Sequence, residues 1–408
     1  MTEGALRAEP GRAGVPLLER VAVGVLERGL AHLEGGQLEV RLPDGSTRRF
    51  GTGEAAASIA VRDLHLFRRI ATRGAIGFGE SYMAGEWDAP DLVALFELLL
   101  RNATAAARRH ATLRRILDAP PRPNRRNGLL RARHNIAYHY DLGNDLFELM
   151  LDPTMTYSCA VFEDETESLE DAQRRKLRRI ADKLELGPED RVLEIGCGWG
   201  SFAILAAAEY GCRVTGLTIS PAQAALARER VRAAHLEDRV EIAEQDYRSH
   251  RGSYTHVASI EMLEAIGEKQ FAPYFAAIDR MLEPGGSACV QTILVPDDRW
   301  GRYRRSPDWI ERYIFPGCLI PSLGAIASAS TRSSRLMIHE VEEIGPGYAE
   351  TLRRWRASFD EHIEDVRALG YDRRFERTWH FYLSFCEAAF RTRWLRDVQL
   401  TLRRSCAR

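Results

Sequence analysis

A glycine-rich turn at residues 193–200, LEIGCGWG, holds the residue types that most suggest ligand chemistry. Gly196, Gly198 and Gly200 follow an apolar run with the spacing G-x-G-x-G, and Glu194 stands just ahead of them. Glycines let a chain turn sharply and let a ligand approach the backbone closely. A purely structural turn between a strand and a helix has a similar composition. The carboxylate, however, suits the amino group of an amino-acid-like ligand, so the turn favours S-adenosylmethionine over a dinucleotide.

A second feature separates this turn from dinucleotide sites. Those sites place an acid about 20 residues after the glycines, where it binds a ribose. The corresponding stretch here is GLTISPAQ, which contains no acid. Hydroxyls and an amide, from Thr218, Ser220 and Gln223, must serve in its place.

Alternating helix and strand patterns begin near residue 170 and surround the turn. The expected strands are RVLEI, VTGLTI, VEIAE, THVASI and SACVQTILV, and helical patterns separate most of them. Such alternation predicts an α/β fold, with a Rossmann-like parallel sheet covered by helices on both faces. Ligands bind these sheets at the carboxyl ends of the strands. RLMIHEVEEI (335–344) and VQLTLRR (398–404) are expected to complete the sheet, and residues 348–396 to be mostly helical.

The first part of the chain reads as a smaller α+β domain. LEVRLPDGSTRRF predicts a hairpin, ASIAVRD a strand and LVALFELLLR a helix, whereas the glycines and aromatics of IGFGESYMAGEWDAPDL (76–92) predict a packed loop. The prolines of DAPPRPNRRNG (118–128) mark the clearest boundary. We therefore predict an N-terminal domain at 1–120, a basic linker at 121–134 and a catalytic domain at 135–408.

Composition narrows the class of protein. The 408 residues are 45% hydrophobic and 28% charged, and no apolar run approaches the ~20 residues that span a bilayer. The N-terminus lacks the apolar core of a signal peptide, which predicts a cytoplasmic location. Seven cysteines without a C-x-x-C pair argue against a disulfide framework and against structural zinc, and we predict no metal site.

Arginines are concentrated in residues 101–135, where ten of them face a single acid, Asp118. A solvated helix face with a basic linker would have this composition. A more specific interpretation is that the arginines bind an anionic partner, either phospholipid headgroups or nucleic acid.

Seven stretches taken in order point to one family. They are HYDLGNDLFELML (139–151), TYSCAVF (156–162), VLEIGCGWGSFA (192–203), GLTISPAQ (216–223), EQDYR (244–248), IEMLEAIG (260–267) and RYIFPG (312–317). With them the chain resembles the cyclopropane-fatty-acyl-phospholipid synthases, including the mycolic acid cyclopropane synthases, strongly over about 135–395. GESYMAGEW (79–87) is also similar to the longer, phospholipid-acting members. The missing ribose acid is itself a trait of this family.

The resemblance implies a fatty-acyl methyltransferase. The family transfers a methyl group from S-adenosylmethionine to a cis double bond of an acyl chain, which leaves a carbocation. A bound bicarbonate, held by a Glu, a His, a Tyr and backbone amides, then takes a proton so that a cyclopropane ring closes. Unsaturated phospholipid acyl chains are therefore the expected substrate, and S-adenosylmethionine and bicarbonate the expected cofactors.

The resemblance also assigns residues. The bicarbonate ligands fall at Glu264 and Tyr313, with backbone contacts at Cys159 and Ile293. The cofactor contacts fall at Tyr157, Ser158, Glu194, Gly196, Gly198, Thr218, Gln223, Gln245 and Asp246. Tyr313 and Cys159 also have a simpler interpretation as packing residues. Glu264 is expected at the carboxyl-terminal edge of the parallel sheet, where an acid would pack poorly, so a functional role is favoured for it.

The sequence departs from the family at the histidine of the bicarbonate site. The family's LxHTI-like segment reads CVQTIL in this chain, so Gln291 occupies the position of the family's histidine. The loop after Glu264 also differs, because EAIG stands where many members have EHVG. A glutamine can donate a hydrogen bond to an oxyanion but cannot carry charge. Relatives with this variation include enzymes that make methylene- or methyl-branched chains by a hydride shift before proton loss. A branched product is therefore the main alternative to the ring.

Two other classes of function remain open. A nucleic-acid methyltransferase would explain the arginines, but the sequence has no cysteine in a Pro-Cys context and no N-P-P-Y-like motif. A non-catalytic lipid- or cofactor-binding relative would explain Gln291. We expect a peripheral enzyme at the inner face of the cell membrane, with its N-terminal domain and arginines on anionic lipid and with no nucleic acid partner. The sequence leaves open a homodimer, the double-bond position and the headgroup preference.

Overall fold

The structure, a computed structural model, describes residues 24, 30, 32–109, 143–164 and 166–405. Contacts divide the chain into two compact units, Met1–Asp91 with Arg101–Ala119, and Leu92–Leu100 with Pro120–Arg408. The predicted linker at 121–134 and most of the arginine-rich stretch lie outside the described residues, so the predicted domain boundaries stay a prediction. In the described part of the chain, no helix is long and apolar enough to cross a membrane.

The first unit contains a four-stranded sheet in the order β2-β1-β3-β4. Its strands are β1 (Gly36–Arg41), β2 (Thr47–Thr52), β3 (Ala55–Val61) and β4 (Trp87–Asp88). β1 and β2 are antiparallel, which confirms the predicted hairpin. Asp44 closes the turn between them by accepting from the backbone N–H of Ser46 at 2.8 Å, and Gly45 has φ 82°.

Helix α2 (His65–Met83) overturns the first part of the loop predicted at residues 76–92, because the helix continues through Gly77 and Gly79 to Met83. The helix kinks at Gly74, whose φ of 56° and ψ of −135° are not helical. A side chain at Gly77 would place its Cβ 2.1 Å from the Arg69 carbonyl oxygen. Glycine therefore serves here for a kink and close backbone packing rather than for a loop. Helix α3 (Leu92–Arg109) follows as predicted.

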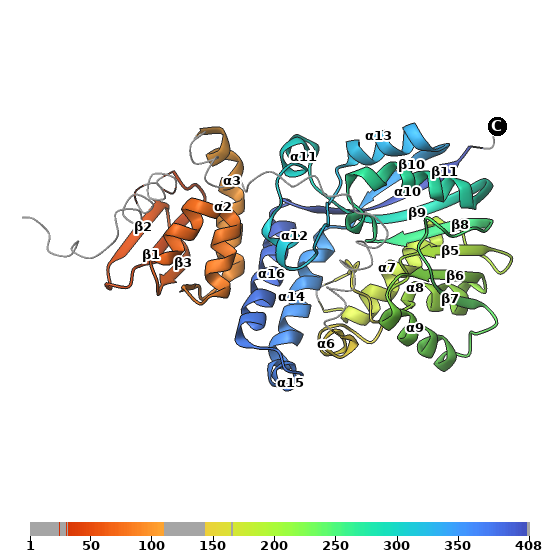
Figure 1. Ribbon diagram of the computed structural model, residues 1–408, viewed down its shortest axis with the longest axis horizontal. Coiled ribbons are helices and arrows are strands. Elements are labelled where there is room, and N and C mark those ends of the chain that lie inside the picture. Colours follow the sequence, from red (N-terminus) through yellow and green to blue (C-terminus); the bar gives the residue numbers. More distant parts are fainter. Residues whose placement is uncertain (1–23, 25–29, 31, 110–142, 165, 406–408) are drawn as a thin grey trace, which may run out of the picture. The chain divides into compact units, whose positions relative to one another are not determined.

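The second unit is built on a seven-stranded sheet in the order β10-β11-β9-β8-β5-β6-β7 (Figure 1). Its strands are β5 (Arg191–Ile195), β6 (Arg213–Thr218), β7 (Val240–Glu244), β8 (Tyr254–Ile260), β9 (Leu282–Leu294), β10 (Leu336–Glu343) and β11 (Arg396–Arg404). β5 to β9 run parallel, and β10 and β11 complete the sheet in antiparallel pairs. The predicted α/β fold with a Rossmann-like sheet is confirmed.

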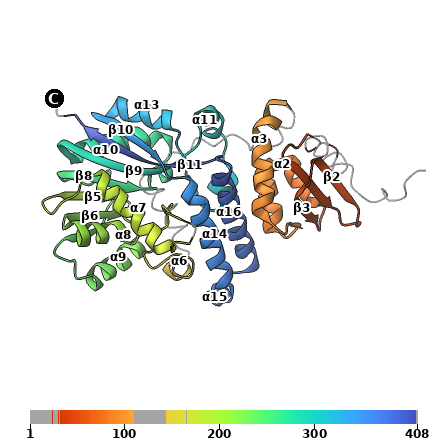
Figure 2. The ribbon, with the colours of Figure 1, turned by 180° about the vertical axis from the view of Figure 1, so that it is seen from behind.

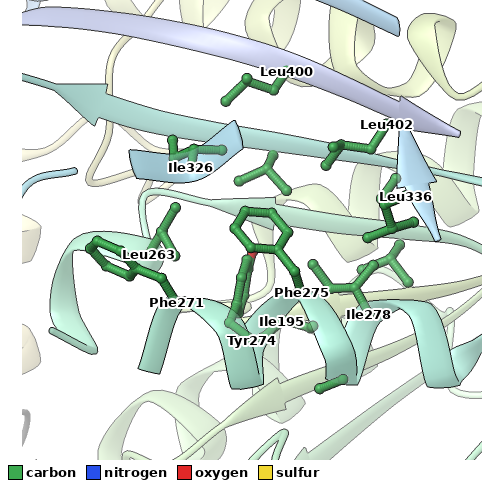
Figure 3. Close-up of a cluster of buried hydrophobic side chains, with 14 of the residues drawn as sticks. Ile195, Leu263, Phe271, Tyr274, Phe275, Ile278, Ile326, Leu336, Leu400 and Leu402 are labelled. Atoms are coloured by element: carbon green, nitrogen blue, oxygen red, sulfur yellow. The ribbon is translucent and has the colours of Figure 1, made fainter. Parts of the chain in front are cut away.

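Helices cover both faces of this sheet (Figures 1 and 2). One set is α10 (Glu268–Met281) and α13 (Leu323–Ser333), and the other is α7 (Leu169–Lys183), α8 (Ser201–Leu205), η1 (Ala206–Tyr210) and α9 (Pro221–Ala233). Figure 3 shows Phe271, Phe275 and Ile278 of α10 pointing toward the strand that carries Leu400 and Leu402. Burial of each such side chain contributes ~1.5–3 kcal/mol, which holds the strand ends in place.

A group of helices beside the strand ends brings aromatic side chains toward the sheet. It comprises α6 (Asn144–Met150), α14 (Pro346–Glu361), α15 (Ile363–Ala368) and α16 (Arg373–Arg391), while α11 (Asp297–Tyr303) and α12 (Trp309–Tyr313) follow β9. The rings of Tyr348 and Phe390 stack between α14 and α16, with centroids 4.4 Å apart. The indole N–H of Trp379 in α16 donates to the sulfur of Met150 in α6 at 3.3 Å. The mostly helical character predicted for 348–396 is confirmed.

Candidate active site

The candidate site lies at the carboxyl ends of the central parallel strands of the second unit. β5 ends at Ile195, directly before the glycine turn, and β6 ends at Thr218. β8 ends at Ile260 and leads into two acidic residues, Glu261 and Glu264. This edge is where parallel α/β sheets bind their ligands.

Two of the three glycines of the turn, Gly196 and Gly198, have different roles. Gly196, Gly198 and Gly200 all have positive φ, of 82°, 52° and 84°. A Cβ at Gly196 would lie 2.7 Å from Cγ of Met262, so this glycine is required by packing. Among the described residues, apart from its two neighbours in the chain, no heavy atom lies within 4 Å of a Cβ built at Gly198. Gly198 is therefore the position at which the backbone can meet a ligand.

Glu194 is buried at the end of β5. Its Oε2 has no hydrogen-bond partner among the described residues, and burial raises the pKa of its carboxyl to about 8. A buried carboxylate needs a cationic partner to stay ionised. The ammonium group of S-adenosylmethionine is such a partner, so the residue fits the role that the sequence predicts.

Binding of S-adenosylmethionine should therefore release roughly one proton per site at pH 7, because a carboxyl of pKa about 8 is mostly protonated until the ammonium arrives. Calorimetry in buffers of different ionisation enthalpy measures this release directly. Glu194→Gln should abolish it and weaken binding. Glu264→Gln is the matched control. It removes another buried carboxyl group whose pKa is raised to about 8, but one that is not expected to meet the cofactor, so the proton release on cofactor binding should stay the same. Release that persists in Glu194→Gln would contradict the assignment.

The polar residues predicted in place of the ribose acid lie together at the end of β6. The Thr218 hydroxyl is 2.9 Å from Oε1 of Gln223. The Ser220 hydroxyl caps α9 by accepting from the Gln223 backbone N–H at 3.3 Å. Gln245, just after β7, donates its backbone N–H to the Thr218 carbonyl at 2.9 Å. Asp246 follows and accepts from Arg248 at 2.7 Å.

Tyr157 and Ser158 lie in an irregular segment held by buried contacts. The Ser158 hydroxyl accepts from the ammonium of Lys176, a fully buried residue of α7, at 2.6 Å. Burial lowers the pKa of that lysine. The Tyr157 hydroxyl is 2.8 Å from the Tyr382 hydroxyl, and its ring lies 5.0 Å from that of Trp355. The segment is thus pinned between α7, α14 and α16.

Glu264 lies in the 3-10 turn η2 (Leu263–Ala265) that follows β8. Its Oε1 accepts from the Thr292 hydroxyl at 2.8 Å and from the backbone N–H of Ile293. Its Oε2 has no hydrogen-bond partner among the described residues. Burial, and then the charge of Glu261, raise the pKa of its carboxyl to about 8. At neutral pH this carboxyl is therefore mostly protonated.

Glu261 is a central residue of the site that the sequence predictions missed. Its Oε1 accepts from the backbone N–H of Cys159 at 2.8 Å and from the Gln291 amide at 2.9 Å. Its Oε2 accepts from the Tyr348 hydroxyl at 2.6 Å. Glu261 sits in IEMLEAIG, and the signal that selected Glu264, an acid just beyond an apolar strand, applies to it equally.

Gln291 is fully buried in β9, and its amide is completely engaged. Besides Glu261, its Nε2 lies 3.2 Å from Oδ2 of Asp397, and its Oε1 accepts from Gln399 at 3.2 Å. Asp397 and Gln399 belong to β11, the neighbouring strand. Burial, followed by the charge of Glu261, holds the pKa of the Asp397 carboxyl well above its usual range. The two β11 residues were not predicted as part of the site.

The tyrosine hydroxyl that reaches Glu261 is that of Tyr348, in the first turn of α14. Tyr313, the residue predicted from RYIFPG, lies at the end of α12 with its ring 5.5 Å from that of Trp309. Its assignment stays a prediction, and Tyr348 is a further candidate. The motif GYAETL (347–352) carries no sign by itself that its tyrosine faces β8.

The resemblance assigns the backbone of Cys159 and Ile293 to bicarbonate. In the structure their N–H groups donate to the side chains of Glu261 and Glu264. The Cys159 thiol points elsewhere, toward the carbonyl oxygens of Ala160 and Ile344 at 3.3 and 3.5 Å. Burial holds its pKa well above the usual range, which does not suit a nucleophile.

The expected cofactors fit this arrangement unequally. S-adenosylmethionine fits, because a buried carboxylate oxygen and an open glycine backbone meet at one turn. Bicarbonate does not fit the donors as they are arranged. The backbone N–H groups of Cys159 and Ile293 and the Gln291 amide, which the sequence assigns to it, already donate to Glu261 and Glu264.

Comparison with known proteins decides the family. The model of the family described as mycolic acid cyclopropane synthetase matches residues 128–400. The chain belongs to this family. It is accordingly an S-adenosylmethionine-dependent methyltransferase of the cyclopropane-fatty-acyl-phospholipid synthase type, as the sequence motifs predict, and methyl transfer to lipid acyl chains is its class of chemistry.

Two curated relatives align with most of the chain. Tuberculostearic acid methyltransferase UfaA1 of Mycobacterium tuberculosis is 40% identical over 390 residues, which are 94% of this chain and 90% of the relative. The cyclopropane-fatty-acyl-phospholipid synthase of Escherichia coli is 36% identical over 373 residues, 89% of this chain and 94% of the relative.

Solved structures of the mycolic acid cyclopropane synthetase family share the catalytic fold. The cyclopropane synthase MmaA2 of Mycobacterium tuberculosis has a TM-score of 0.61 and 29% identity, and the match covers 67% of this chain and 98% of that chain. The mycolic acid cyclopropane synthase CmaA1, in complex with SAH and CTAB, has a TM-score of 0.61 and 28% identity with the same coverage.

Proposed function

We propose that this chain transfers a methyl group from S-adenosylmethionine to a cis double bond in an acyl chain of a membrane phospholipid, and that the product carries an exocyclic methylene branch. One observation carries the proposal: the cofactor turn adjoins a cluster of buried carboxyl groups. Met262, which packs on Gly196, stands in the chain between Glu261 and Glu264. This arrangement supports a methyl donor bound at the turn with a proton acceptor beside it.

Aromatic rings beside the cluster suit a reaction that passes through a carbocation. The Tyr157 ring lies 5.1 Å from Phe147, 5.0 Å from Trp355 and 6.4 Å from Phe315, and Phe315 lies 5.9 Å from Tyr382. Electron-rich ring faces attract a cation without trapping it as a nucleophile would. They also exclude water, which would otherwise capture the cation.

The chemistry follows from these groups. When bound, S-adenosylmethionine supplies an electrophilic methyl group on a sulfonium. An alkene is a weak nucleophile, so the site must hold the double bond in line with that methyl group. The new C–C bond leaves the positive charge on the other alkene carbon. Loss of a proton from the added methyl group then closes a ring, or gives an exocyclic methylene if a hydride has shifted first.

Two findings favour the branched product. Gln291 stands at the position where the resemblance expects a histidine. The tuberculostearic acid methyltransferase, whose name states a methyl-transfer product, is 40% identical over 94% of this chain. A cyclopropane ring is the second candidate product, which the 36% identity to the Escherichia coli synthase supports.

Phospholipid as the substrate implies work at a membrane surface. The ten arginines of residues 101–135 support a peripheral association with anionic lipid at the inner face of the cell membrane. The motif GESYMAGEW in the N-terminal unit, similar to phospholipid-acting members, supports the same location.

Expression in a bacterial host that has no cyclopropane lipids tests the proposal. With methionine deuterated in its methyl group, unsaturated phospholipid chains should gain one methylene unit that keeps all but one of the deuterium atoms. Fragmentation of the chains should show an exocyclic methylene rather than a ring, and Gly198→Val is the inactive control. A ring would establish the second candidate. Label in nucleic acid with none in lipid would contradict the function.

A further inference from the structure

We propose that the carboxylate of Glu261, and not a bound bicarbonate, is the base that takes the proton from the methylated acyl chain. The inference rests on the proposed function and adds a catalytic residue to it. It also accounts for the disagreement between the expected bicarbonate and the groups that would have to hold it.

The donors around Glu261 form an oxyanion site that its own carboxylate fills. A backbone N–H from Cys159, an amide N–H from Gln291 and a hydroxyl from Tyr348 approach at 2.6–2.9 Å. They come from three separate parts of the second unit: the segment before α7, strand β9 and helix α14. All three donate, and an ionised carboxylate only accepts.

The backbone at Glu261 supports a role for its side chain. Its φ is 48°, in the left-handed region that favours glycine. Residues held in that region cluster at functional sites, where the surrounding structure over-determines them. Here the three donors to the carboxylate are that surrounding structure.

The other carboxyl groups nearby are suited to stay neutral beside it. Glu264 and Asp397 are buried, and burial together with the charge of Glu261 raises the pKa of each. Glu261 is only half-buried, whereas Glu264 is buried and Asp397 is fully buried. Like charges at close range repel each other, and neutral neighbours remove that repulsion around the three donors that meet the Glu261 side chain.

The step balances without any further reactant. The methyl C–S bond of the cofactor breaks as the alkene forms the new C–C bond, and the acyl chain becomes a carbocation. An oxygen of Glu261 then removes a proton from the added methyl group. The electron pair of that C–H bond closes the third side of a ring, or, where a hydride has first shifted so that the charge lies on the methyl-bearing carbon, forms the exocyclic double bond. Glu261 becomes neutral and returns the proton to water after the products leave.

Bicarbonate binding gives a test that does not depend on turnover. We expect titration of the full chain with ¹³C-labelled bicarbonate to show no binding to the wild type and saturable binding to Glu261→Gly. This variant frees the donors and also suits the positive φ. Binding of S-adenosylmethionine, measured in parallel, should be unchanged in it. Binding of bicarbonate to the wild type, or to neither protein, overturns the proposal.

Methyl transfer to vesicles of unsaturated phospholipid supplies the second readout. In buffer freed of carbonate the wild type should keep its full rate, and Glu261→Gln should lose ~10²–10⁴-fold. Added bicarbonate should restore activity to Glu261→Gly but not to Glu261→Gln, whose amide still fills the site. A wild-type rate that falls on removal of carbonate and recovers on its return overturns the proposal. A wild type that methylates no lipid would contradict the proposed function, while the titration still decides the occupant of the donor site.

Discussion

Replacement of Gly198 by valine should weaken the binding of S-adenosylmethionine by ~100-fold or more, which corresponds to ~2.8 kcal/mol. Gly198 has φ 52°, and no heavy atom of the described structure beyond its chain neighbours lies within 4 Å of a Cβ built there. A branched side chain would therefore project into the space beside the turn, where Glu194 and the ends of β5 and β6 meet. Calorimetric titration with the cofactor measures the effect.

A matched control separates this contact from backbone strain. Gly370, between α15 and α16, also has a positive φ, of 96°, and in the part of the chain that the structure describes no heavy atom beyond its chain neighbours lies within 4 Å of its Cβ position. Both valine variants should lose ~1–2 kcal/mol of folding stability, because a left-handed conformation penalises an L side chain. Only Gly198→Val should lose cofactor affinity. Equal affinities in Gly198→Val and the wild type would rule out the turn as the cofactor site.

The sheet and the edge proposed to bind the cofactor could be predicted because their signals are local. Short apolar strands alternate with helical patterns, and the glycine turn, Glu194 and GLTISPAQ occupy the ends of two neighbouring strands. Hydrophobic periodicity carries that information residue by residue. The loop predicted at 76–92 failed because composition was weighed alone. Gly77 serves close contact with the Arg69 carbonyl inside a kinked helix, and nothing in its immediate neighbours shows this.

The carboxylate cluster was harder to predict because its members are distant in the chain. Glu261 meets Tyr348 across 87 positions, and Gln291 meets Asp397 across 106. The resemblance to the family compares short motifs, so it identified Tyr313 in RYIFPG and Glu264 in IEMLEAIG. It gave no account of how β11 and α14 would complete the site. The departure at Gln291 was visible in the sequence, but its partner Glu261 became visible only in three dimensions.

Replacement of Glu264 by alanine should lower the rate of methyl transfer ~10²–10⁴-fold, the range lost when an acid–base arrangement is misplaced. The change leaves the Ile293 N–H and the Thr292 hydroxyl without the acceptor they share. Both lie on β9 beside Gln291, which holds Glu261, so the base would lose its position. Single-turnover rates on vesicles of unsaturated phospholipid check this.

Glu264→Gln tells whether the charge of this carboxyl matters. An amide oxygen can accept both hydrogen bonds, and the amide is neutral, as is a carboxyl of pKa about 8 at pH 7. The glutamine variant should therefore keep most of the activity that alanine loses. If Glu264→Ala and Glu264→Gln lose activity equally, Glu264 acts as an ionised ligand or base, which is the role that the resemblance gives it.

Protein stability supplies an independent check on the protonation state of Glu264. The folded pKa of about 8 exceeds the usual value of 4.5, so the folded chain binds more protons than the unfolded chain between these values. Its contribution to stability is then fully present below pH ~4.5 and is lost as pH rises toward ~8. Denaturant titrations across this window should show a shallower decline in Glu264→Gln than in the wild type. A decline of equal slope would mean that Glu264 is ionised in the fold, and that two charged glutamates share the site.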